Sequence, residues 1–381
     1  MIRTYKYRLS PTKKQTHLLT ALFDQMQTVY NDALNERRWY WRRSRCGVSY
    51  YAQWRRIRDE RHALPDEMGM LNATSVQQML RRVDKAYRAF YQGKRGAPRF
   101  KGRNRFKSVE YRHGDGCKLA GDRLYVQHVG HVRVRLHRAV PDGADIRQVV
   151  IKRSAGGKWY VCLQLHLTEP APVVHTGAVV GVDVGLHSLL ALSDGTLVDN
   201  PRWLRASLAN LRVAQRRMSR RKKFGSGWRK AARRVAVLQE RVANQRRDFW
   251  HKTTTDLTRK YSLIAVENLN LAFMLHNGSL SLSAHDAALG AFRQMLEYKV
   301  ENTGTQIVAV NAHNTSQACS GCGVIVTKSL NVRVHRCPDC GLTLDRDVNA
   351  ARNILARACG RQVEALTYPV GDCVASDAPP L

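Results

Sequence analysis

Three acidic residues lie at positions that suit a divalent metal ion. Asp183 is inside the apolar run AVVGVDVG, Glu267 follows the apolar residues of LIAVENLN, and Asp347 begins a predicted helix in LDRDVNAARNI. An unpaired charge in an apolar strand is unfavourable, whereas carboxylates from separate elements can share Mg²⁺ and leave positions for water and a phosphate. Taken singly, each acid could also be a turn or capping residue. Together they indicate a metal site.

Such a site predicts metal-dependent hydrolysis of a phosphodiester. Two Mg²⁺ or Mn²⁺ ions roughly 3.5–4 Å apart can activate a water and stabilise the leaving 3′-oxygen. We expect Asp183 to bridge the two ions, with Glu267 and Asp347 completing one site each. Asp345 or the Asn349 amide could support these ligands from behind.

Four of the nine cysteines form two closely spaced pairs. Cys319 and Cys322 make one pair, and Cys337 and Cys340 make the other, after a spacer of fourteen residues. Four thiolates at this spacing favour one structural Zn²⁺ with no open position over a redox pair, an iron–sulfur site or two disulfides. The other cysteines are scattered singly, which is typical of a reducing compartment. Two nearby histidines are alternative ligands, although contacts with solvent or nucleic acid are favoured for them: His313 and His335.

The charge balance indicates a polyanionic partner. The chain has 63 Lys and Arg against 30 Asp and Glu, a formal charge of +33. Such an excess opposes compaction unless a polyanion neutralises it, and nucleic acid is the partner we expect; a ribosomal-type or membrane-surface protein is the alternative. The sequence shows neither a secretory h-region nor eighteen consecutive apolar residues, so we expect a cytoplasmic protein that makes no membrane contact.

Two basic segments are candidate nucleic-acid contacts. In residues 98–108, PRFKGRNRFKS, cations alternate with Phe100 and Phe106, for which anchoring in the core is favoured over stacking on bases. Residues 202–252 carry 17 Lys and Arg against two acids. The cations that we expect to contact nucleic acid are Arg99, Lys101, Arg103, Arg105, Lys107, Arg216, Arg217, Arg220, Arg221, Lys222 and Lys223.

Hydrophobic periodicity predicts an α/β chain of several parts. An opening strand leads to a helix beginning at Ser10-Pro11, and helical spacing continues to about residue 91. A period of two over 109–167 predicts a small antiparallel barrel that the opening strand completes. The expected domains are residues 1–10 (first barrel strand), 11–95 (helical), 96–172 (barrel), 173–312 and 343–360 (metal-binding α/β domain), 313–342 (zinc ribbon) and 361–381 (mobile tail).

Three motifs carry a resemblance to a known family. GVDVG, AVENL and DRDVNAARNI resemble the catalytic motifs of the RuvC branch of the ribonuclease H-like fold. With the cysteine ribbon between the second and third motifs, the chain resembles the TnpB family of transposon-encoded RNA-guided nucleases, relatives of type V CRISPR effectors. The resemblance implies catalytic, metal-binding roles for Asp183, Glu267 and Asp347, and it favours Asp347 over Asp345. It also implies a helical recognition domain and a wedge barrel.

The same resemblance implies a guide RNA from the transposon end and a monomer that cuts double-stranded target DNA beside a short transposon-adjacent motif. Polar residues within 74–78 are candidates for reading that motif. The alternatives are a compact type V CRISPR effector, a guide-dependent DNA-binding repressor that no longer cuts, and a Holliday-junction resolvase. Three intact acids argue against the repressor, and the long helical and barrel half argues against the resolvase.

Overall fold

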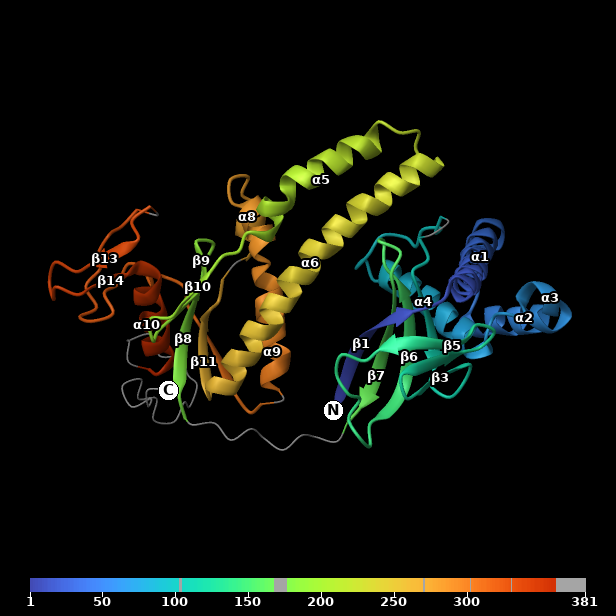
Figure 1. The fold of residues 1–381 in the computed structure, drawn as a ribbon, viewed down its shortest axis with the longest axis horizontal. Helices are drawn as coiled ribbons and strands as arrows, with labels where there is room; N and C mark the ends of the chain where they lie inside the picture. The colour runs from blue at the N-terminus through green and yellow to red at the C-terminus, as the bar shows by residue number, and fades with distance from the viewer. Residues whose placement is uncertain (103–104, 168–176, 270, 302, 330, 361–381) are drawn as a thin grey trace. The chain divides into compact units, whose positions relative to one another are not determined.

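The chain forms two compact units, residues 1–169 and residues 170–381 (Figure 1). The computed structural model describes residues 1–102, 105–167, 177–269, 271–301, 303–329 and 331–360. The expected tail at 361–381 and the predicted contact Arg103 lie outside these described residues. Among the described residues, the helices are all too short or too polar to cross a bilayer.

Among its described residues, a nearly closed antiparallel sheet and four helices build the first unit. The seven strands have the order β2-β6-β7-β1-β5-β4-β3. The elements are β1 (Ile2–Ser10), α1 (Lys13–Ser44), α2 (Tyr50–Ala63), α3 (Pro65–Met68), α4 (Ala73–Tyr91), β2 (Ser108–Arg112), β3 (Cys117–Ala120), β4 (Arg123–Val126), β5 (Gly130–Arg135), β6 (Asp145–Arg153) and β7 (Trp159–His166).

The opening strand completes this sheet, as its alternating residues predict. β1 pairs with β7 along its length and with β5 at its end. The predicted helix start at Ser10-Pro11 is wrong, because Ser10 still pairs with Arg133 in the sheet. Thr12 caps α1 instead, in a capping box with Gln15.

The second unit is a mixed five-stranded sheet covered on both faces. Its order is β10-β9-β8-β11-β12, in which β8, β11 and β12 are parallel. The elements are β8 (Val179–Val184), β9 (Ser188–Leu192), β10 (Leu197–Asp199), α5 (Trp203–Ser219), α6 (Ser226–Lys260), β11 (Leu263–Glu267), α7 (Leu271–His276), α8 (Ser281–Ala287), α9 (Leu289–Val300), β12 (Gln306–Val310), β13 (Val334–Arg336), β14 (Thr343–Asp345) and α10 (Arg346–Ala358).

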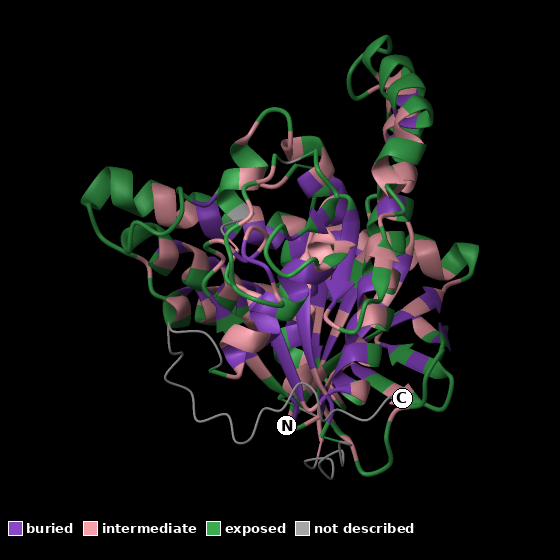
Figure 2. Cartoon of the chain, turned by 90° about the vertical axis from the view of Figure 1, so that its left-hand side faces the viewer, coloured by how far each residue is buried: buried purple, intermediate pink, exposed green. Residues whose placement is uncertain are grey.

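Strand alternation divides the core of this unit into two layers. Val180, Val182 and Ile264 pack with residues of α6 and α9, including Trp250 and Phe292. The neighbouring positions of the strands face α10, where Ala265, Val308 and Val310 meet Ile354 and Leu355. Figure 1 shows α10 on one side of these strands and α6 with α9 on the other, and Figure 2 shows buried residues concentrated on the strands.

Candidate metal and nucleic-acid sites

Two of the predicted acids lie side by side at the end of the parallel strands. β8 and β11 are in register with Val182 opposite Val266, so the next residues along the two strands are Asp183 and Glu267. Both acids share the sheet face of Gly181 and Ala265, because successive side chains alternate between faces. That is the face covered by α10.

The third acid reaches this face because α10 packs very close to the sheet. A Cβ added to Gly181 would lie 2.0 Å from the carbonyl oxygen of Ala351 and 2.8 Å from Leu355 Cβ. Only glycine permits this approach. Asp347 stands one helical turn before Ala351, at the end of α10 that leads towards Asp183.

The charges of both other acids act on Asp183. Burial raises the pKa of Asp183 well above its ordinary value, and the charges of Glu267 and Asp347 raise it further. Burial also raises the pKa of Glu267, while the Thr315 hydroxyl, which donates to Glu267, opposes the shift. Burial and the neighbouring Asp345 raise the pKa of Asp347. A divalent cation would relieve this repulsion, so the donor set fits Mg²⁺ or Mn²⁺.

Asp345 and Asp347 have different tasks. The Asp345 carboxylate caps α10 by accepting hydrogen bonds from the amides of Asp347 at 2.8 Å and Val348 at 3.2 Å. The capping alternative for Asp347 is therefore wrong. The Asp347 carboxylate lies 3.8 Å from Arg333 Nη1.

The four paired cysteines converge on one point. Their sulfur atoms all lie within 4.8 Å of one another, with 3.6 Å between Cys319 and Cys340 and 3.5 Å between Cys322 and Cys337. Tetrahedral Zn²⁺ with bonds of about 2.3 Å separates its sulfurs by roughly 3.8 Å. The cysteine cluster therefore fits one zinc ion.

The two halves of the ribbon have the same local geometry. In each half, the backbone amide of the first cysteine donates a hydrogen bond to the carbonyl oxygen five residues later. These bonds join Cys319 to Val324 and Cys337 to Leu342, both at 2.9 Å. The following glycines, Gly323 and Gly341, have φ of +84° and +74°, a conformation that favours glycine.

Neither nearby histidine belongs to the cysteine cluster. His335 is buried with its Nδ1 beside the Lys328 ammonium, and His313 is exposed. The alternative of a histidine ligand for zinc is therefore not supported by the geometry.

Two buried asparagines of α10 tie the ribbon to the carboxylates, a link that sequence reasoning missed. Asn349 Nδ2 donates to the Ala318 carbonyl at 2.7 Å, and its Oδ1 accepts from the Ser320 amide at 2.9 Å. Asn353 Nδ2 donates to the carbonyls of Thr315 at 2.8 Å and Ala318 at 2.7 Å. The segment that contacts Glu267 through Thr315 thus continues directly into the first zinc knuckle.

The helices α5 and α6 form a hairpin whose predicted cations are all exposed. Its base is held by Asp286 of α8, which is 2% exposed. This carboxylate accepts from the α5 amides of Leu204 at 2.8 Å and Arg205 at 3.1 Å, and pairs with Arg246 of α6 at 2.9 Å. Arg217, Arg221, Lys230 and Arg234 line a groove between the two helices. Contact with nucleic acid remains a prediction for the hairpin cations.

The basic segment 98–108 divides into exposed and anchored residues. Arg99, Arg105 and Lys107 are exposed. Lys101 instead lies with its ammonium 4.3 Å from the Tyr30 ring centroid, and burial lowers its pKa. The prediction that the phenylalanines anchor in the core is confirmed for Phe106, which is 4% exposed. It is wrong for Phe100, which is 47% exposed and lies under the Arg38 guanidinium.

Comparison with known proteins shows the fold class of the chain. The chain resembles a Cas12f1 solved in complex with sgRNA and target DNA, with a TM-score of 0.55 and 14% identity over 90% of this chain and 83% of that one. Family models match residues 162–278 ("Probable transposase"), 290–354 ("Cas12f1-like, TNB domain") and 1–46 ("Helix-turn-helix domain"). The fold is thus that of an α/β protein with a RuvC-type domain.

Two proteins of similar sequence show the family to which the chain belongs. A Streptomyces pristinaespiralis protein named as an RNA-guided DNA endonuclease is 36% identical over 94% of this chain and 91% of its own length. The Escherichia coli K12 protein InsQ, named in the same way, is 31% identical over 76% of this chain and 77% of its own. The chain belongs to the TnpB family.

Proposed function

We propose that this chain is a transposon-encoded, RNA-guided DNA endonuclease that cuts target DNA beside a short adjacent motif. The observation that supports the proposal is the register that sets Asp183 beside Glu267 on adjacent parallel strands, together with the effect of the Asp347 charge on Asp183. The names of the full-length relatives support the guided activity.

Asp183, Glu267 and Asp347 would hold Mg²⁺ or Mn²⁺. When bound, the ions supply an activated water and neutralise charge on the leaving oxygen. The ligand oxygens around one Mg²⁺ lie within about 4.2 Å of one another. Among the described residues, only the cysteines form a group with ligand atoms within 4.8 Å. The three carboxylates are spaced more widely than this, and we propose that together they would hold two ions, as two-metal hydrolysis of a phosphodiester requires.

The surrounding residues would position these ligands. Thr315 directs Glu267 through its hydroxyl, and Asp345 fixes the first turn of α10 and therefore Asp347. Arg346 is held by the carbonyl of Ser329 at 3.0 Å and places positive charge near Asp183 and Asp347. Cations at this position suit the approach of a phosphate.

The other predicted components complete the proposal. One structural Zn²⁺ would be held by Cys319, Cys322, Cys337 and Cys340. The α5–α6 hairpin would follow the backbone of the guide–target duplex, whose shape rather than sequence a protein of this kind reads. We propose one guide RNA and one double-stranded target on a monomer in the cytoplasm.

The test is cleavage by the protein purified together with its own RNA. The co-purified RNA is sequenced, a plasmid with a matching target is supplied, and cutting is measured in Mg²⁺ and in EDTA. Asp183→Asn, Glu267→Gln and Asp347→Asn should each lose cutting by at least a hundredfold while binding the target. Asp122→Asn, an exposed acid 3.6 Å from Arg133 in the first unit, is the matched control and should cut normally. Normal cutting by Asp183→Asn would refute the site.

A further inference from the structure

The C-terminal end of α1 exposes three consecutive large aromatic residues. Trp39 is 49% exposed, Tyr40 is 42% exposed and Trp41 is 50% exposed; we call these three the α1 aromatic cluster. The buried stripe of α1 ends at Leu34. Adjacent helical residues point about 100° apart, so one packing surface within the fold cannot cover all three. Large exposed aromatic surface of this kind marks an interaction site.

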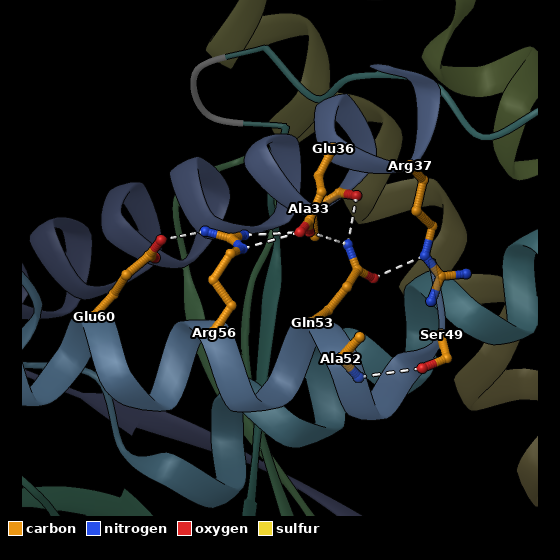
Figure 3. A network of polar contacts seen from close by, with 8 residues as sticks. All are labelled: Ala33, Glu36, Arg37, Ser49, Ala52, Gln53, Arg56 and Glu60. Atoms are coloured by element: carbon orange, nitrogen blue, oxygen red, sulfur yellow. Dashed lines mark hydrogen bonds and ion pairs between the residues drawn. The ribbon is translucent and has the colours of Figure 1, made fainter. Parts of the chain in front are cut away.

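A polar network holds this end of α1 in place (Figure 3). Gln53 of α2 is fully buried, donates to the Ala33 carbonyl at 2.9 Å and to Glu36 at 2.6 Å, and accepts from Arg37 Nε at 2.7 Å. Arg56 binds the same Glu36 at 3.0 Å. The anchor lies within one helical turn of Trp39, so the α1 aromatic cluster is presented from a fixed helix.

The segment around the cluster is strongly cationic, although Arg37, Arg56 and Arg58 pair with acids outside it. Residues 37–58 contain eight arginines and no acidic residue. The Arg43 guanidinium lies 5.3 Å from the Trp39 ring centroid, and that of Arg45 lies 5.9 Å from the Trp41 centroid. Arg42, Arg43 and Arg45 are exposed. A partner for this surface must therefore offer both planar apolar groups and negative charge.

We propose that the α1 aromatic cluster is a binding site for unpaired nucleotides. Bases stack on Trp39 and Trp41, and their phosphates pair with the adjacent arginines. Stacking requires splayed bases, so a single strand is bound and a closed duplex is not. A second copy of the chain is a poorer partner, because it would bring like charge to this arginine-rich surface. The proposal rests on the proposed function only in taking nucleic acid as the ligand.

The experiment measures binding by the full chain carrying Asp183→Asn, so that no cleavage intervenes. The probes are a fluorescein-labelled 20-nucleotide RNA of mixed sequence, the DNA of the same sequence, and the corresponding DNA duplex. Trp39→Leu and Trp41→Leu should each weaken single-strand binding at least fivefold, as loss of one stacked base does, and change duplex binding less than twofold. Trp41→Phe, which keeps an aromatic face, should bind within twofold of the parent.

Salt dependence separates stacking from phosphate contact. Trp41→Leu should leave the slope of log affinity against log salt unchanged, whereas Arg42→Gln should reduce its size by about 0.7 on a single strand. Tyr125→Leu is the matched control, because Tyr125 is 39% exposed on β4 outside the cluster. Unchanged melting curves confirm that the variants fold.

A direct contact is sought by ultraviolet crosslinking to each probe. Trypsin should release the peptide Trp39–Arg42 carrying a nucleotide. Weaker binding of Trp39→Leu and Trp41→Leu to single-stranded RNA alone, to single-stranded DNA alone or to both supports the proposal. The result also shows which nucleic acid supplies the unpaired nucleotides. Equal losses on single strands and duplex, or no loss and no crosslink on any probe, would overturn it. Because binding needs no cleavage, the result is the same whether or not the chain cuts DNA.

Discussion

Gly181→Ala should displace the third carboxylate without altering any acid. The added Cβ would lie 2.0 Å from the Ala351 carbonyl oxygen and 2.9 Å from the Leu355 amide nitrogen. Contacts below about 3.0 Å are not tolerated, so the first atom must retreat by 3.0 − 2.0 = 1.0 Å or more. Both atoms belong to the backbone of α10, and therefore no change of rotamer relieves the clash. The helix itself must move.

The displacement predicts loss of both stability and rate. Inserting a methyl into a packed contact costs about 1–3 kcal/mol, and moving a catalytic group by about 1 Å can cost roughly 10²-fold in rate. Because α10 carries Asp347, we expect single-turnover cleavage at saturating target to fall by that order, with target affinity nearly unchanged.

The matched control is Gly278→Ala in the same unit. A Cβ at Gly278 meets nothing within 4 Å, and this variant should melt and cut like the parent. Cleavage by Gly181→Ala within threefold of the parent would show that the position of α10 does not control the active site.

Three further outcomes follow from the same structure. Cys337→Ser should lose the bound zinc, as measured by elemental analysis. Because Asn349 joins the ribbon to α10, this variant should also melt at a lower temperature and cleave more slowly. A variant that lacks zinc yet melts and cuts normally would contradict this. In EDTA, the raised pKa of Asp183 makes the folded protein lose stability as pH rises from about 4 towards that raised value, so Asp183→Asn should melt higher than the parent at pH 7.5. Excess Mg²⁺ should remove or reverse this difference, and an identical melting temperature in EDTA would refute the claim of an uncompensated charge. Lys223→Gln should reduce the salt slope for duplex binding by about 0.9, and an unchanged slope would exclude a phosphate contact at the hairpin tip.

The sequence allowed prediction of the features that depend on local patterning. Alternation in β1, the apolar run that contains Asp183 and the one that leads to Glu267 identified strands, and two cysteine pairs of fixed spacing identified the ribbon. Acids that end parallel strands lie at one edge of a sheet. Their meeting point therefore follows from strand order, which the motifs of the family indicate.

Features that depend on contacts between distant segments could not be predicted. Asn349 and Asn353 look like ordinary helix residues until Ala318 is seen to accept from both. Asp286 gives no sign in sequence that it caps α5 from α8. Lys101 and Phe100 occupy the same basic pattern, yet only packing distinguishes the half-buried cation from the exposed ring.

The most direct test of the carboxylate site is the location of manganese in crystals of the full chain. Mn²⁺ scatters anomalously, so a soaked crystal reveals each bound ion without assumptions about its ligands. We predict anomalous density between Asp183, Glu267 and Asp347, with Asp183 touching every ion there. If Mn²⁺ supports DNA cleavage in solution while the anomalous density lies away from these three carboxylates, they are not the catalytic metal ligands.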